Sequence, residues 1–146
     1  MRETAKSLRA YFLFAGLIAE LLALRDVTSA SQLGSLGGAL PPSWMLAIWF
    51  PILAHVILGC AYIWAGIRLP VELARGAGWI KTMLLASIVV LVIDVVLTGY
   101  VLGIELARVG MTTPLIGLAI SAYLLANVRR LADEAMAKQP PQARVT

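Results

Sequence analysis

Residues 82–104, TMLLASIVVLVIDVVLTGYVLGI, contain a single charged side chain, Asp94, in an otherwise uncharged apolar run. A membrane-spanning helix needs about 20 mainly apolar residues to cross roughly 30 Å of hydrocarbon, because lipid satisfies no exposed backbone group. Runs 8–24, 44–67 and 114–128 are similarly apolar. The sequence therefore predicts an all-α polytopic membrane protein, with a four-transmembrane-helix bundle over residues 1–131.

The composition excludes an ordinary soluble domain. Hydrophobic residues make up 60% of the chain and charged residues only 14%, and the mean hydropathy is +0.87. Soluble domains have roughly 45–50% apolar and about 25% charged residues. One cysteine, Cys60, allows no intramolecular disulfide, and one histidine, His55, allows no imidazole cluster for a metal.

The basic residues predict an orientation. Of the 12 lysines and arginines, only Arg25 and Arg108 lie in the segments after the first and third spans, and the others lie before, between or after the spans on the opposite side. This asymmetry indicates a multi-pass protein of the cell inner (plasma) membrane with both termini cytoplasmic, and it accounts for the net charge of +4 without a nucleic-acid partner. We expect residues 25–43 to form an outer loop with a short interfacial helix or lid, and residues 132–146 to form a polar, disordered cytoplasmic tail.

Ionisable residues inside the spans are costly, so each normally faces the bundle interior and a partner. Glu20, His55 and Asp94 are such residues, and Thr98 lies one helical turn after Asp94. His55 and Asp94 fall near the midpoints of neighbouring antiparallel spans, so we expect them at one depth and in contact. The four residues form the predicted intramembrane polar core, which is either a structural His–Asp contact or a proton relay or ligand site.

The second span is rich in aromatic residues. Trp44, Trp49, His55 and Tyr62 are the candidate wall of a ligand pocket. However, Trp44 and Trp49 are five residues apart, which is about 140° around a helix. We therefore expect Trp49 and Trp64 on the outside of the bundle and His55 on the inside.

Residues 41–53, PPSWMLAIWFPIL, resemble the PPxW…W…L pattern that opens the second helix of the TspO/translocator family. The last span is similar to the final helix of that family, with Pro114, Ala122, Leu124, Leu125 and Asn127. The resemblance implies binding of tetrapyrrole- or sterol-like ligands, with Trp44, Trp49 and Asn127 near the pocket. That family has five spans, and the four-span layout here is instead similar to DoxX-like four-helix proteins.

The chain has no nucleophile–base–orienter set, no phosphate-binding loop and no metal-ligand spacing, so we expect no catalytic residues and no metal. The favoured interpretation is a small non-catalytic accessory or scaffold subunit of a larger membrane complex, whose partners are membrane lipids and other membrane subunits or a second copy. The alternative is a binder of a hydrophobic small molecule, such as a tetrapyrrole, carotenoid, quinone or sterol-like pigment or lipid. The candidate ligand-binding residues are Trp44, Trp49, His55, Tyr62, Asp94 and Asn127.

Overall fold

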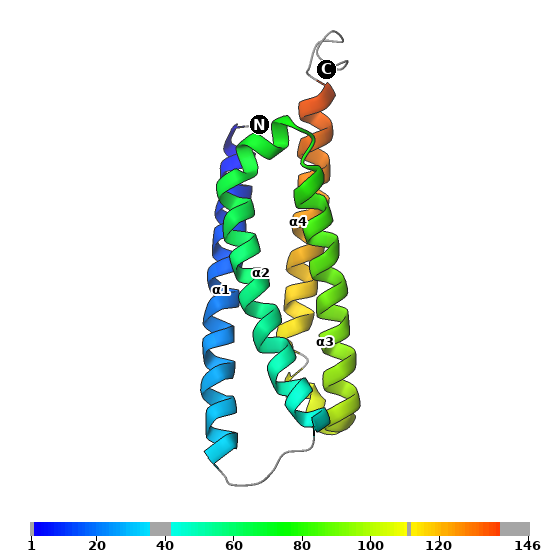
Figure 1. The fold of residues 1–146 in the computed structure, drawn as a ribbon. Coiled ribbons are helices and arrows are strands. Elements are labelled where there is room, and N and C mark those ends of the chain that lie inside the picture. Colours follow the sequence, from blue (N-terminus) through cyan, green and yellow to red (C-terminus); the bar gives the residue numbers. More distant parts are fainter. Residues whose placement is uncertain (1, 36–41, 111, 138–146) are drawn as a thin grey trace.

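The computed structural model describes residues 2–35, 42–110 and 112–137. These residues form the helices α1 (Arg2–Ser35), α2 (Pro42–Ala74), α3 (Gly78–Gly110) and α4 (Thr112–Ala137) (Figure 1). Each helix contains a segment long and apolar enough to cross a membrane, at Ala5–Thr28, Met45–Ala74, Gly78–Val101 and Thr112–Ala137. The predicted all-α four-helix membrane bundle is confirmed.

Helix α1 is longer than its predicted span. It continues through Arg25 to Ser35, where the sequence predicted the first part of an outer loop. The hydroxyls of Thr28 and Ser31 donate to the backbone oxygens of Arg25 and Thr28, so these polar side chains are satisfied on the helix itself. The prediction of a loop starting at Arg25 is therefore wrong, and the rest of the predicted lid lies largely outside the described residues.

Helix α4 also exceeds its predicted span. The disordered tail was predicted to start at residue 132, but the helix continues to Ala137. Leu131 and Ala132 are buried, and this stretch has good helix formers and no proline or glycine. The prediction of disorder is wrong for residues 132–137. It rested on the polar composition, which does not show that one side of this helical stretch is buried against the bundle. The remaining tail, 138–146, lies outside the described residues.

The connection between α2 and α3 is a tight turn. Gly76 has φ +83°, and the backbone N–H of Ala77 donates to the carbonyl of Glu72 at 2.6 Å. Glycine adopts this left-handed conformation at little steric cost, which explains its position just after the end of α2. Ala77 itself is fully buried, so the turn is fixed against the end of the bundle.

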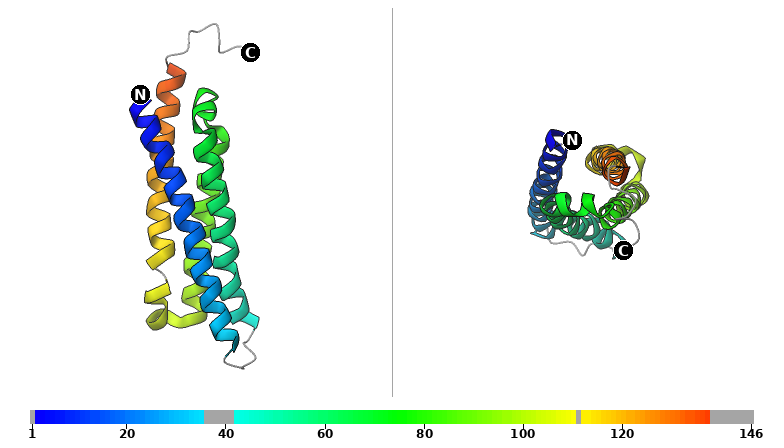
Figure 2. Two further views of the ribbon diagram at one scale, coloured as in Figure 1. Left: turned by 90° about the vertical axis from the view of Figure 1, so that its left-hand side faces the viewer. Right: turned by 90° about the horizontal axis from the view of Figure 1, so that it is seen from above.

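The helices pack as an open four-helix arrangement, in which α1 lies mainly against α2 and α4 mainly against α3. The view along the bundle shows α1 and α4 on either side of an opening (Figure 2). Glycines bring α1 and α2 together: a Cβ atom on Gly16 would lie 2.8 Å from the backbone oxygen of Gly59. Such close approach is typical of membrane helices.

The outer surface of the bundle is apolar. About a third of the residues in each spanning segment are buried inside the bundle, and large apolar side chains such as Phe14, Leu53 and Val96 are more than half exposed. A soluble protein rarely exposes so much contiguous apolar surface. The arrangement is that of a bundle whose outer face meets lipid.

Candidate ligand site between α1 and α4

Three hydroxyls join α2, α3 and α4 in the interior. The Tyr62 hydroxyl donates to Ser87 Oγ at 3.0 Å and lies 2.7 Å from Ser121 Oγ, where either oxygen is able to donate. Ser87 also donates to the backbone oxygen of Leu84. The Ser121 hydroxyl lies 2.7 Å from the backbone oxygen of Gly117 as well, so its single proton is shared between that oxygen and Tyr62. All three side chains are buried, so this network fixes the register of three helices through satisfied polar groups.

A second polar cluster surrounds His55. The imidazole is buried, and its Nδ1 lies 3.7 Å from Asp26 Oδ2 of α1 but has no hydrogen-bond partner among the described residues. Asp94 of α3 is also buried and lies close enough to His55 and Asp26 to interact electrostatically with both. Thr98 Oγ1 donates to Asp94 Oδ1 at 3.4 Å. His55 therefore lies among carboxylates of two other helices.

Three of the four residues of the predicted polar core lie near one another. His55, Asp94 and Thr98 lie together, as expected, but no hydrogen bond joins His55 to Asp94 among the described residues. Glu20 is not part of this cluster. It is half-buried between α1 and α2, where its side chain packs over Gly59 and accepts a hydrogen bond from Cys60 Sγ at 3.4 Å. Its position on a different face of α1 from Asp26 separates it from the centre of the bundle.

Asp26 is the residue that the sequence interpretation missed. It lies within residues 25–43, which the sequence predicted to be an outer loop. A signal was present: the buried apolar residues of the described part of α1 include Leu8, Phe12, Ala15, Ala19 and Ala23, and the same helical spacing continues to Asp26. The side chain remains partly exposed and also forms an ion pair with Arg25 at 2.7 Å.

A cavity of about 220 Å³ lies beside His55, between α1 and α4. Its wall is apolar except for His55, Thr113 and Tyr62, and the Tyr62 hydroxyl already bonds to the two serines. Among the described residues that line this cavity, His55 has a buried nitrogen without a hydrogen-bond partner. The lining consists of Ala15, Ile18, Ala19, Leu22, His55, Leu58, Tyr62, Leu91, Thr113, Ile116, Gly117 and Ile120.

The six candidate ligand residues do not form one pocket. His55 and Tyr62 line the cavity, with Asp94 close to His55 but not in its wall. Asn127 lines a different hollow, at the end of the bundle where α1 begins and α4 ends, and donates to the Tyr123 carbonyl. Trp49 is 52% exposed, so it is not a pocket wall, and the side chain of Trp44 lies outside the described residues.

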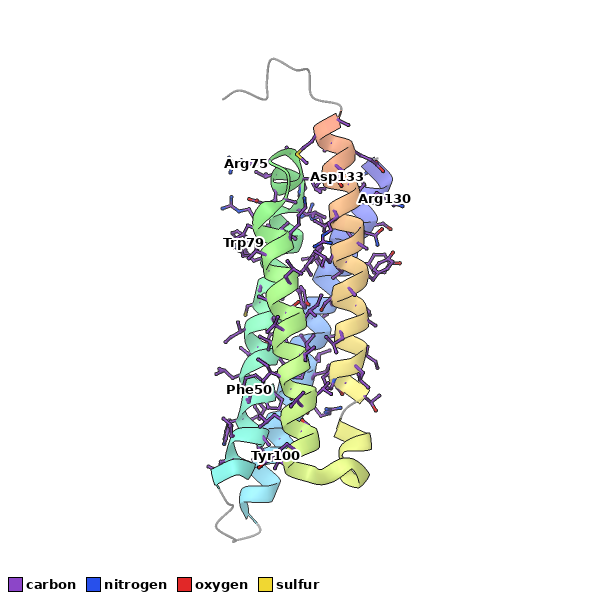
Figure 3. All side chains as sticks on the ribbon, turned by 90° about the vertical axis from the view of Figure 1, so that its right-hand side faces the viewer. Phe50, Arg75, Trp79, Tyr100, Arg130 and Asp133 are labelled. Atoms are coloured by element: carbon purple, nitrogen blue, oxygen red, sulfur yellow. The ribbon has the colours of Figure 1, made fainter. Side chains whose placement is uncertain are left out.

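The outward positions of Trp49 and Trp64 are confirmed. Trp64 is 42% exposed and packs edge-on against Trp79, with ring centroids 4.4 Å apart, while Arg68 lies over the Trp64 ring. Tryptophan and arginine at one end of a membrane bundle are typical of the lipid headgroup level. Figure 3 shows Trp79 toward the same end as Arg75 and Arg130, and Phe50 and Tyr100 toward the other.

The comparisons with known proteins assign no family: no family model, no curated protein and no solved structure matches the chain. The likeness of residues 41–53 to the TspO/translocator family, and of the layout to DoxX-like proteins, therefore stays a prediction. Within the described residues, no group of histidine, cysteine and carboxylate side chains is arranged to hold a metal ion. The geometry of the cavity is thus the basis for a functional proposal.

Proposed function

We propose that this chain is a non-catalytic multi-pass membrane protein that binds a hydrophobic small molecule in the cavity between α1 and α4. The observation that carries the proposal is the position of His55, a buried imidazole that borders an apolar cavity and whose Nδ1 has no hydrogen-bond partner in the described part of the chain. Apolar pockets with a few convergent polar groups are the usual form of small-molecule sites.

The size of the cavity limits the ligand. An apolar cavity of about 150 Å³ holds benzene in another protein, whereas whole drug-sized ligands occupy about 300–1,000 Å³. A volume of about 220 Å³ therefore suits one ring or a chain segment, with the rest of the molecule lying along the gap between α1 and α4. This favours a quinone-, carotenoid- or sterol-like molecule over a tetrapyrrole. A carbonyl or hydroxyl on that ring would hydrogen-bond to the imidazole.

The test is purification of the full chain in mild detergent, followed by extraction and mass spectrometry of bound small molecules. We expect one apolar molecule with a carbonyl or hydroxyl group. His55→Leu should lower its occupancy about tenfold, because a hydrogen bond worth about 1–1.5 kcal/mol is lost. Trp49→Leu is the matched control, since Trp49 faces outward and should leave occupancy unchanged. Equal loss in both variants, or no bound molecule, would contradict the proposal.

A second candidate function is an accessory subunit of a larger membrane complex. The observation that favours it is a ridge of exposed apolar side chains along the outer face of α2, formed by Leu46, Trp49, Leu53, Ile57 and Trp64. Membrane subunits associate through such packed faces, although lipid also covers them. Crosslinking from Leu53 in intact membranes distinguishes the two functions, because a subunit gives one discrete protein product and a ligand binder gives none.

The cellular location belongs to the same proposal. Helix α1 begins and α4 ends at one end of the bundle, which carries most of the basic residues (Figure 1). The positive-inside bias supports a cytoplasmic position for that end in the inner membrane.

A further inference from the structure

The gap between α1 and α4 continues well beyond the cavity beside His55. Next to it lies an apolar hollow of about 560 Å³, which shares Ala15, Ile18 and Ile120 with the cavity. This hollow in turn shares Tyr11 and Tyr123 with a third, of about 360 Å³, at the end where α1 begins and α4 ends. The three hollows form one groove with an apolar middle.

The end of the groove differs chemically from its middle. Ser7, Asn127 and Arg130 line it, together with Tyr11 and Tyr123, whose rings meet edge-to-face at 5.9 Å. The guanidinium of Arg130 is 62% exposed, and its ion pair with Glu134 is long, at 3.9 Å. Arg130 makes no hydrogen bond to another residue of the described ranges. Its donors are therefore available to an anion.

The surrounding charge is also favourable for an anion. Three basic residues, Lys6, Arg9 and Arg129, lie within one helical turn of the groove residues on α1 and α4. Two acidic residues, Asp133 and Glu134, lie equally near, so the positive charges outnumber the negative ones. Figure 3 shows Arg130 at the end of the bundle where Arg75 and Trp79 also lie, which is the level that tryptophan and arginine occupy beside lipid headgroups.

The length of the groove matches one leaflet. Ile116, in the cavity wall, and Asn127, at the polar end, are eleven residues apart on α4. At 1.5 Å per residue this separation is about 16 Å, close to half of the roughly 30 Å hydrocarbon thickness. A single acyl chain that starts at the polar end thus reaches the cavity near the middle of the membrane.

We propose that this groove binds one anionic phospholipid, with its phosphate at Arg130 and Ser7 and one acyl chain between α1 and α4. The arginine fork suits a phosphate oxygen pair, and Ser7 and Asn127 supply further polar contacts at the mouth. The phenyl rings of Tyr11 and Tyr123 border the first part of the chain. This site goes beyond the proposed function, because its phosphate contacts lie at the far end of the gap from His55 and do not require a ligand there, although the acyl chain lies in the same gap.

The test is native mass spectrometry of the full, delipidated chain in detergent, titrated with phosphatidylglycerol or phosphatidylcholine. We expect phosphatidylglycerol to bind at least about tenfold more tightly, because only its headgroup leaves a net negative charge beside Arg130. Glycerol phosphate, which has no acyl chains, should not compete at equal concentration. Equal affinity for the two lipids, or full competition by glycerol phosphate, would overturn the proposal.

Matched variants locate the site. Arg130→Gln should lower phosphatidylglycerol affinity about tenfold, whereas Arg129→Gln, next to it on α4 but outside the groove lining, should change it less than about twofold. Ala119→Phe should block the acyl chain, and the exposed Ala122→Phe should not. Equal effects within either pair would refute this location.

One further variant separates this site from the proposed function. His55→Leu should leave lipid binding intact while it lowers occupancy of the small molecule. Loss of lipid binding in His55→Leu would refute an independent lipid site, and loss of the small molecule alone would support both assignments.

Discussion

His55 Nδ1 and Asp26 Oδ2 lie 3.7 Å apart on neighbouring helices, close enough for electrostatic attraction but too far for a hydrogen bond. A polar atom buried without a hydrogen bond costs about 1–3 kcal/mol. Within the described ranges, the bundle thus holds a buried imidazole nitrogen that makes no hydrogen bond. Such groups are rare in native structures, and an ordered water, an ion or a functional role explains some of them.

The Asp94 side chain should contribute to the stability of the bundle. Asp94 is 3% exposed, so Asp94→Asn should lower the free energy of unfolding by less than about 1 kcal/mol. Asp94→Leu should lower it by about 1–3 kcal/mol, because leucine removes the acceptor of the Thr98 hydroxyl and the carboxylate near His55. Unfolding in mixed detergent micelles measures this difference. Glu134→Gln, on the exposed end of α4, serves as the control. Equal stability of the two Asp94 variants would show that the carboxylate does not stabilise the cluster.

The hydroxyl network should be cooperative. Tyr62→Phe removes the shared hydroxyl and should cost about 1 kcal/mol, because Ser87 and Ser121 keep only their bonds to their own helices. The losses in unfolding free energy of Tyr62→Phe and Ser121→Ala should sum to more than the loss in the double variant, since each single substitution removes the same Tyr62–Ser121 hydrogen bond. Tyr123→Phe, at an exposed position, should have little effect. Strict additivity in this cycle would argue against the network.

The approach of α1 to α2 depends on Gly16. A Cβ atom there would lie 2.6 Å from Ile63 Cγ1 and 2.8 Å from the Gly59 backbone oxygen, and the backbone oxygen has no rotamer by which to move away. Gly16→Ala should therefore destabilise the bundle by about 1–3 kcal/mol. Gly78→Ala has open space around the new methyl group and should be neutral or slightly stabilising. Similar melting of both variants would show that this helix contact is looser than described.

The orientation is testable with reporter fusions. The ten-to-two distribution of basic residues predicts cytoplasmic reporters after Arg75 and after Lys138, and an external reporter within residues 31–38. Cysteine labelling at the same sites gives an independent measurement, with Cys60 replaced by alanine. An external reporter after Arg75 would contradict both the orientation and the location of the proposed lipid site in the cytoplasmic leaflet.

Hydrophobic runs predicted the number of helices correctly because spanning segments differ so strongly from all other sequence. Helical spacing also predicted His55 on the inside of the bundle and Trp49 and Trp64 on the outside. It missed Asp26 and misassigned Glu20. Which of these two acidic residues lies near His55 depends on where α1 ends and on which neighbouring helix each face packs against. The groove was equally invisible, since it depends on the larger separation of α1 from α4, which is a property of the assembled helices.

Filling the cavity separates ligand binding from structural stability. Ala19 is buried and lines the cavity, so Ala19→Leu adds apolar atoms to empty space. The variant should bind the small molecule at least about tenfold more weakly, because the ring has lost its volume, yet it should unfold at an equal or higher temperature, since filled cavities favour the folded state. Ala10→Leu, on an exposed face of the same helix, should alter neither property. A bound molecule that persists unchanged in Ala19→Leu would place the ligand elsewhere, and strong destabilisation would show that the space beside His55 is too rigid to accept a ring.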